Sequence, residues 1–112
     1  MGLDGYTEDV MNIDPLDEKI ASFGFEVQTI DGHDLDEIVA IFDALPPTSG
    51  DRPQAIIANT IKGKGVGHME LNPAWHVGGP IEGDAYDEIV REIRGETSTP
   101  TDYWPRGKTI RD

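Results

Sequence analysis

The sequence predicts an α/β fold built on a strand–helix–strand unit. Residues 25–30 alternate roughly between apolar and polar side chains and are rich in β-formers, as in a half-buried strand. Residues 55–61 form a short, nearly continuous apolar run, which is typical of a strand buried on both faces. An apolar helical pattern covers residues 35–45 between them. This order predicts a parallel strand pair with a right-handed crossover.

Turn and capping residues predict the elements before the first strand. Residues 1–13 are expected to form an irregular lead-in. Asp14 is then expected to N-cap a helix whose first position is Pro15, and Gly24 is expected to end it. The apolar positions of this helix are Leu16, Ile20 and Phe23.

The second helix has a sequence signature at its start. Asp34 and Glu37 have the spacing of a capping box. Asp31, His33 and Asp34 also resemble a charge constellation, but turn and capping roles account for them. The apolar stripe of the helix is Leu35, Ile38, Val39, Phe42 and Leu45. Residues 46–53 are expected to form a surface loop.

The chain after the second strand is expected to be mostly loop. Residues 62–83 are rich in glycine and have no helical period, which predicts a long structured loop. The apolar residues Tyr86, Ile89, Val90 and Ile93 mark a last helix, which Gly95 ends. Residues 96–112 are expected to form an extended tail. In it, Tyr103, Trp104 and Pro105 either dock on a partner chain or belong to a disordered end.

Two strands do not make a stable parallel sheet, because such sheets are covered on both faces and flanked by further strands. The second strand is also too apolar for an exposed edge. We therefore expect the chain to be part of a larger α/β sheet whose other strands come from another polypeptide.

Composition excludes several classes of function. The 112 residues fit one domain and carry 22 acidic and 9 basic side chains, a net charge of −13. This charge disfavours nonspecific binding to nucleic acid or to an anionic membrane. The lack of cysteine excludes disulfides, thiolate metal ligands and a cysteine nucleophile. With no apolar run of membrane-spanning length and no signal-peptide pattern, a soluble, cytoplasmic protein is expected.

One basic window interrupts the acidic chain. Residues 52–81 contain three bases, Arg52, Lys62 and Lys64, against the single acid Glu70. The glycine-rich run from Lys62 to Gly67 follows the second strand, and such a loop lets backbone N–H groups approach an anion. It is neither a Walker motif nor a Rossmann fingerprint. A glycine-rich turn with two solvated lysines is the equally open interpretation.

An aromatic residue followed by histidine stands later in the same window. Trp75 and His76 among glycines suit a pocket wall with a titratable donor. His68 and His76 are eight residues apart and no third ligand has a clear spacing, so no metal site is expected. His68 is interpreted as a packed or solvated residue.

Taken together, these segments resemble the transketolase family. The segments that carry the resemblance are, in order, Gly24–Val27, Ile30–Asp34, Pro53–Ile57, Thr60–Val66, Met69-Glu70 and Trp75-His76. The similarity is to the N-terminal subunit of split transketolases and covers roughly residues 4–95. It implies that residues 1–95 are the C-terminal portion of the diphosphate-binding domain, followed by the tail at 96–112. The implied fold is a partial three-layer parallel-sheet thiamine-diphosphate-binding domain, completed by partner chains.

The resemblance also implies cofactors and site residues. The family uses thiamine diphosphate with a divalent metal, usually Mg²⁺. Its metal motif and its pyrimidine-activating glutamate are not found here, so both are expected on partner chains. His76 matches the family histidine that contacts the diphosphate and lies near the reacting carbons, although Val77 departs from the family pattern. Lys64 and Gly65 are implied as further cofactor-binding residues. Lys62 and Lys64 are also implied as residues that order the loop or face substrate phosphate.

The implied function is that of a transferase subunit, active only with partner chains. A multi-chain transketolase of carbohydrate metabolism would transfer a two-carbon ketol unit from a ketose or ketose phosphate to an aldose acceptor. Two alternatives stay open. One is a non-catalytic structural or regulatory remnant of such a domain. The other is a subunit of a related 2-oxo acid or deoxyxylulose-phosphate-synthase-like enzyme.

Overall fold

A computed structural model of the chain describes residues 1–46 and 52–100. The chain divides into two compact units. One comprises residues 13–60, and the other comprises residues 1–12 together with the residues from 61 onward. Each unit is described by itself.

The unit of residues 13–60 is built on a two-stranded parallel sheet. Strand β1 spans Glu26–Asp31 and strand β2 spans Gln54–Asn59. They pair in parallel from Glu26 opposite Gln54 to Asp31 opposite Asn59. Both predicted strands and their parallel pairing are confirmed, although β2 ends two residues before Ile61. The sheet contains only these two strands among the described residues.

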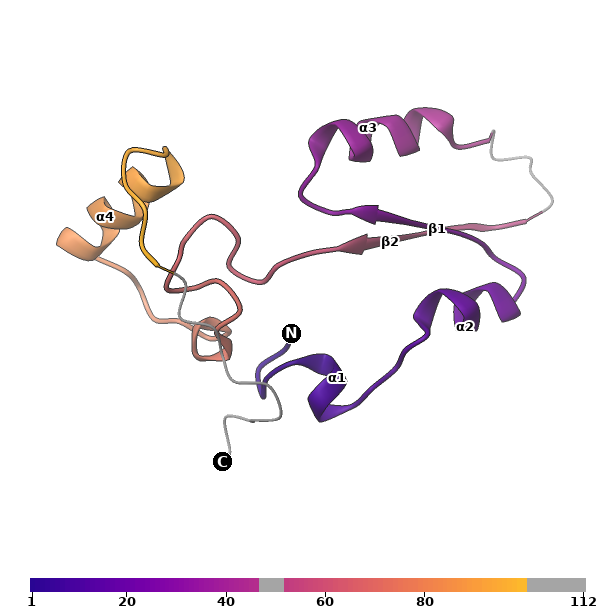
Figure 1. Ribbon diagram of the computed structural model, residues 1–112, viewed down its shortest axis with the longest axis horizontal. Coiled ribbons are helices and arrows are strands. Elements are labelled where there is room, and N and C mark those ends of the chain that lie inside the picture. Colours follow the sequence, from indigo (N-terminus) through magenta and orange to yellow (C-terminus); the bar gives the residue numbers. More distant parts are fainter. Residues whose placement is uncertain (47–51, 101–112) are drawn as a thin grey trace. The chain divides into compact units, whose positions relative to one another are not determined.

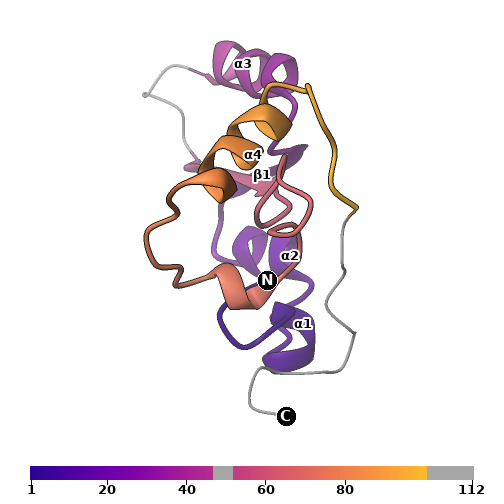
Figure 2. The ribbon, with the colours of Figure 1, turned by 90° about the vertical axis from the view of Figure 1, so that its left-hand side faces the viewer.

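Two helices pack on β1. Helix α2 spans Leu16–Ser22, and helix α3 spans Leu35–Ala44 and connects the strands along the chain. They lie on opposite sides of the sheet (Figures 1 and 2). This arrangement confirms a partial α/β unit. The complete three-layer cofactor-binding fold stays a prediction.

The start of α2 differs from the prediction. The N-cap is Pro15 and makes no side-chain capping bond, so Asp14 is not the cap and Pro15 is not the first helical residue. Instead, the Lys19 ammonium donates to the carbonyls of Ile13, at 2.7 Å, and Asp14, at 3.1 Å. This side chain therefore holds the chain before the helix. At the other end Gly24 follows the helix with φ of +90°, as expected.

The start of α3 confirms the predicted cap but not the whole capping box. Asp34 Oδ1 accepts from the backbone N–H groups of Asp36 and Glu37, at 2.9 and 3.0 Å. Glu37 Oε2 accepts from the N–H of Asp31 at 2.6 Å, whereas Asp34 N–H donates to the Asp31 carbonyl. Glu37 thus secures the end of β1 rather than the N-cap. Asp31 Oδ1 accepts from the N–H of His33, which confirms the turn role of this cluster.

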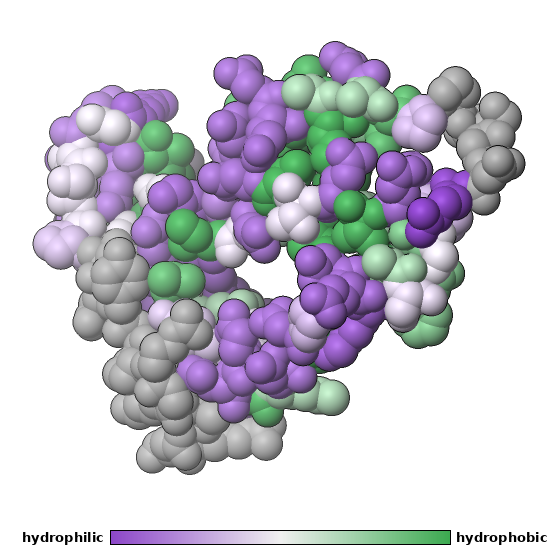
Figure 3. All heavy atoms as spheres, turned by 45° about the vertical axis from the view of Figure 1, so that its right-hand side comes forward, coloured by the Kyte–Doolittle hydropathy of each residue, from purple (hydrophilic) through white to green (hydrophobic). Residues whose placement is uncertain are grey.

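The predicted apolar stripe of α3 is divided between two faces. The buried residues of this unit are Ile30 on β1 and Ile41 on α3, and Ile41 was not part of the predicted stripe. Ile38 and Leu45 are half-buried. The other members of the stripe are exposed, namely Leu35, Val39 and Phe42. We call these three residues the α3 outer stripe, and Figure 3 shows apolar surface exposed on this unit.

Strand β2 is less buried than predicted. Residues 54–57 are half-buried, and Ala58 and Asn59 are exposed. Within this chain β2 is therefore not buried on both faces, and its burial by strands from another polypeptide stays a prediction. The physical reason is that β2 pairs with β1 along one edge and has no other neighbouring strand among the described residues.

The other unit contains three short elements. They are helix α1 at Thr7–Val10, the 3₁₀ helix η1 at Pro73–Trp75 and helix α4 at Asp84–Ile93. Helix α1 thus interrupts the lead-in that was predicted to be irregular, and η1 lies within the loop that was predicted to be structured. Helix α4 is confirmed, and Gly95 follows its end with φ of +72°. The core of this unit includes Tyr6, Val66 and Pro73.

Residues 96–100 form neither helix nor strand. Tyr103, Trp104 and Pro105, for which docking and a disordered end were both open, lie outside the described residues. In the part of the chain that the structure describes, none of the helices combines the length and apolar character needed to cross a membrane.

The turn after β1 has no room for a side chain at Gly32. A Cβ there would lie 2.6 Å from Thr60 Cγ2 and 3.0 Å from the Asn59 carbonyl oxygen. We expect Gly32→Ala to lower the free energy of unfolding by about 1–3 kcal/mol, measured by urea denaturation. Gly79→Ala is the matched control, because a Cβ at Gly79 meets no atom within 4 Å. Equal effects of the two substitutions would contradict the crowding seen at Gly32.

Candidate functional site

The loop that follows β2 along the chain is closed by its own backbone. The Lys62 carbonyl accepts from the N–H of Leu71 at 2.9 Å, so the main chain returns to its starting point. Gly63 has φ of +74°, and a Cβ at this position would overlap the backbone of Met69. The close approach therefore requires glycine here. We call residues 62–71 the closed loop.

The closed loop brings Lys62 to His76. Lys62 Nζ lies 3.2 Å from His76 Nδ1. An ammonium group can only donate, so a hydrogen bond between these atoms requires Nδ1 as the acceptor and the ring proton on Nε2. His76 is exposed, and Lys62 is half-buried. The pair therefore combines a positive charge with an imidazole N–H donor at the surface.

Helix η1 fixes the backbone of His76. Asn72 caps this helix, its Oδ1 accepting from the N–H of Ala74 at 3.0 Å. The fully buried Pro73 anchors the turn, and its carbonyl accepts from the N–H of His76 at 2.9 Å. The histidine predicted from sequence thus stands at the C-cap of an ordered turn.

His68 packs against the residue before His76. The rings of His68 and Trp75 lie edge to face, with centroids 5.0 Å apart and an interplanar angle of 64°. This contact supports the interpretation of His68 as a packing residue. Across residues 1–46 and 52–100, no group of three histidine or acidic side chains is arranged to hold a metal ion.

The other two predicted cofactor-binding residues contact Glu70. Gly65 N–H donates to Glu70 Oε1 at 3.0 Å, and Lys64 Nζ lies 3.6 Å from the same oxygen. Lys64 is half exposed, so this ion pair contributes little stability. The structure therefore brings Lys62, rather than Lys64, to His76. The cofactor-binding role of Lys64 and Gly65 stays a prediction.

The third base of the predicted basic window has a structural role. The Arg52 guanidinium donates to the carbonyls of Gly24 and Phe25, both at 3.1 Å. These contacts lie within the unit of residues 13–60, just before β1. The candidate anion site is thus formed around Lys62, without Arg52.

Sequence reasoning missed Glu92, which lies on α4. Its Oε1 accepts from the backbone N–H groups of Gly67, at 3.0 Å, and Thr99, at 2.8 Å. Its Oε2 is buried and has no hydrogen-bond partner among the described residues. In the sequence Glu92 is one of many acids on a helix, and nothing distinguishes it from a solvated residue.

The two backbone donors change the acidity of Glu92. Its pKa is lowered, first by the Thr99 N–H and then by the Gly67 N–H, because both stabilise the carboxylate. Burial acts in the opposite direction, and the nearby His68 adds a small lowering effect. The carboxylate is therefore the favoured form of this side chain in the fold.

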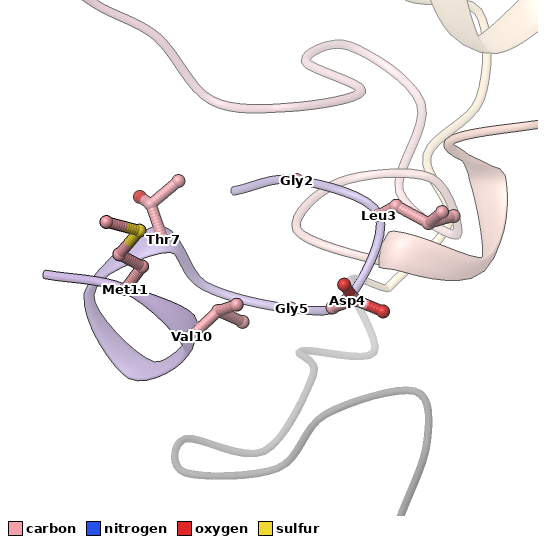
Figure 4. Close-up of a pocket in the computed structure, with 7 residues that line it drawn as sticks. All are labelled: Gly2, Leu3, Asp4, Gly5, Thr7, Val10 and Met11. Atoms are coloured by element: carbon pink, nitrogen blue, oxygen red, sulfur yellow. The ribbon is translucent and has the colours of Figure 1, made fainter.

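A separate hollow lies near the N-terminus (Figure 4). It has a volume of about 150 Å³ and is lined within residues 2–11, with apolar side chains from Leu3, Val10 and Met11. Asp4 and Thr7 are its polar side chains, and no basic residue lines it. This hollow therefore does not suit an anion, and the Lys62–His76 pair is the stronger candidate.

Comparison with known proteins gives a consistent set of relatives, although no family model matches the chain. Over 94 residues it is 36% identical to a subunit of the apulose-4-phosphate transketolase of Actinobacillus succinogenes, covering 84% of this chain and 33% of that protein. Over 76 residues it is 43% identical to the 6-deoxy-6-sulfo-D-fructose transketolase subunit SqwG of a Clostridium species, covering 68% of this chain and 27% of that protein.

A more distant relative is the transketolase of Rattus norvegicus. It is 30% identical over 87 residues, which are 78% of this chain and 13% of that protein. The chain thus spans about a third, or less, of the length of these curated relatives.

The Glu92 contacts predict an acid-sensitive signal. Because the pKa is lowered in the fold, the stability that the carboxylate contributes is fully present above the ordinary glutamate pKa and is lost as the pH falls through the lowered value. We expect the amide NMR signals of Gly67 and Thr99 to shift together, with a midpoint below the ordinary glutamate pKa. Glu92→Gln should remove this inflection and Glu88→Gln should keep it. A midpoint above the ordinary value would contradict the assignment.

Proposed function

This chain is a homologue of transketolase-family proteins over most of its length, and from that premise we propose that it is one component of a multi-chain, thiamine-diphosphate-dependent transketolase. The assembled enzyme transfers a two-carbon ketol unit from a ketose or ketose phosphate to an aldose acceptor. Two relatives are named for sugars with a phosphate or a sulfo group, and a basic pair at the surface suits such anions.

The single observation that carries the proposal is the 3.2 Å contact between Lys62 Nζ and His76 Nδ1. The two residues are 14 positions apart in the sequence, so the folded loop is required to bring them together. A solvated lysine in a simple glycine-rich turn would not need this closed arrangement. The geometry therefore favours a binding site over a glycine-rich turn with two solvated lysines.

The donor set fits the diphosphate of the proposed cofactor. An ammonium group and an imidazole N–H both donate to phosphate oxygens, and charged donors make the stronger bonds. A Cβ at Gly65 would meet no atom within 4 Å, so the loop is open on that side. Lys64 is a further donor, provided that it leaves Glu70. We place the Mg²⁺ ligands and the pyrimidine-binding part on partner chains.

Each residue has a distinct chemical task in this proposal. Thiamine diphosphate, when bound, supplies the electron sink for carbanion chemistry, and the protein supplies binding and orientation. Lys62 contributes positive charge toward the diphosphate. It also fixes the His76 tautomer, because its ammonium group donates to Nδ1. The Nε2–H group then donates to a phosphate oxygen or to an oxygen on which negative charge develops. An imidazole can also move protons near neutral pH.

The exposed apolar surface supports the proposal that partner chains bind to this one. Parallel sheets are normally covered on both faces and flanked by further strands. Ile56 and Ile57 on β2 are only half-buried, and the α3 outer stripe is exposed. We propose that partner chains supply the further strands and cover this surface. Two relatives are each named as one subunit of an apulose-4-phosphate transketolase, which supports an assembly of more than one polypeptide.

Substitution of the pair tests the function. We expect His76→Ala to lower kcat of the assembled enzyme about a hundredfold, because a placed donor to developing charge is lost. Lys62→Met should weaken thiamine diphosphate binding about tenfold, through loss of one charged hydrogen bond. Steady-state kinetics and cofactor titration measure these effects. Arg91→Ala, an exposed charge change on α4, is the control and should leave both values unchanged. Turnover within a few-fold of the parent in His76→Ala would remove the catalytic role.

Native mass spectrometry tests the assembly. We expect the chain, co-expressed with its genomic neighbours and supplied with thiamine diphosphate and Mg²⁺, to form a complex that retains cofactor. The same chain purified alone should retain none, because the proposed metal ligands lie on the partner. A stable, cofactor-free chain that recruits no other polypeptide would favour a non-catalytic remnant.

A further inference from the structure

We propose that Glu92 is a positioning residue, which sets the geometry of the Lys62–His76 pair by holding the backbone of the closed loop. The proposal rests on the proposed function for its catalytic consequence, but its structural part concerns this chain alone. All the contacts that carry it lie within one of the two compact units.

Glu92, which is not itself part of the closed loop, binds the backbone at the middle of that loop. Its Oε1 accepts from the N–H of Gly67, which is buried and lies between Lys62 and Leu71 in the sequence. The adjacent Val66 is also buried, and its carbonyl accepts from the N–H groups of Met69 and Glu70. Because Gly67 is buried, its N–H group needs a hydrogen-bond acceptor, and Glu92 supplies one.

The first connection runs from Gly67 to Lys62. The closed loop begins and ends at the hydrogen bond between the Lys62 carbonyl and Leu71 N–H. Glu70 ties the first half of the loop to the second through the N–H of Gly65. A loop closed in this way moves as one body, so a displacement at Gly67 shifts the backbone of Lys62.

The second connection runs from Gly67 to His76. The carbonyl of His68, the next residue, accepts from Asn72 Nδ2 at 3.3 Å. Asn72 caps η1, and His76 is the C-cap of the same helix. The His68 ring also packs on Trp75, one residue before His76. Both members of the pair are thus connected to the segment that Glu92 holds.

Glu92 is suited to this role because α4 is a regular helix and its carboxylate also holds Thr99. A Cβ on Gly67 would overlap the Thr99 carbonyl and come within 3.2 Å of Glu92 Oε1. The backbone after α4 therefore lies directly against the loop. This contact leaves Gly67 no room to move toward that segment.

The test compares Glu92→Ala with Glu92→Gln in the full chain. The readout is the ¹⁵N NMR signature of the His76 ring, which reports its tautomer without any cofactor. In the parent, the Nε2–H tautomer should dominate because Lys62 donates to Nδ1. Glu92→Ala should lower the Nε2–H fraction toward that of a solvated histidine side chain, and Glu92→Gln should restore most of it because its amide oxygen still accepts from Gly67. Glu88→Ala, on the same helix and exposed, is the matched control and should keep the parent signature.

Gly67→Ala provides a second, independent perturbation. The added methyl group should displace the loop and reproduce the tautomer change of Glu92→Ala. Thermal denaturation of each variant separates local displacement from loss of the fold. An unchanged His76 tautomer in folded Glu92→Ala would overturn the proposal. If both substitutions abolish folding, Glu92→Asp takes their place, because its carboxylate is one methylene shorter and is withdrawn from Gly67. An unchanged His76 tautomer in a folded Glu92→Asp variant whose Gly67 amide signal has moved would then overturn the proposal.

Activity of the assembled enzyme gives the catalytic consequence. We expect Glu92→Ala to lower kcat about tenfold with little change in KM for the donor sugar, because the pair is misplaced rather than removed. If the tautomer changes but no assembly shows transketolase turnover, the proposed function fails and the positioning role stands. If turnover is present and the tautomer is insensitive to Glu92, the positioning role fails and the proposed function stands.

Discussion

The parallel hydrogen-bond ladder between β1 and β2 is the constraint on which the organisation of residues 13–60 depends. Six residue pairs are in register, from Glu26 opposite Gln54 to Asp31 opposite Asn59. Helix α3 must span the connection between the two strands, and it packs on β1 as α2 does. Arg52 and Glu37 secure the two ends of β1 by binding backbone groups there. Polar side chains thus secure the two ends of β1, and apolar side chains cover only part of the two faces of the sheet.

Local sequence patterns predicted most of the elements. Alternation and apolar runs located β1 and β2, and Asp34 was correctly identified as the α3 cap because its bonds to Asp36 and Glu37 are local. Errors arose where a more distant partner competed. Lys19 holds the chain before α2 in place of the Asp14 cap, and Glu37 binds Asp31 rather than Asp34. Strand β2 is only half-buried because it has a single neighbouring strand among the described residues.

The candidate site was predictable only in part, because the contacts that build it join residues that are distant in the sequence. His76 was identified from its place beside Trp75 and from the family resemblance. Of the two lysines only Lys64 was named as cofactor-binding, whereas Lys62 is the one that contacts His76 in the structure. Spacing along a glycine-rich loop does not show which lysine turns toward the histidine, because positive φ values at Gly63 and Gly65 redirect the chain. Glu92 carried no sequence signal, since its bonds go to backbone N–H groups, which every residue type except proline provides.

The α3 outer stripe also bears on how such a protein is made in a cell. Leu35, Val39 and Phe42 form a row of apolar side chains at successive helical turns, with fractional exposures of 75%, 59% and 60%. Exposed rows of this kind promote self-association at high concentration. If a partner polypeptide covers this row, as proposed above, synthesis of the two chains in balance would limit aggregation. Stoichiometry of expression, rather than intrinsic stability alone, would then determine how much functional protein accumulates.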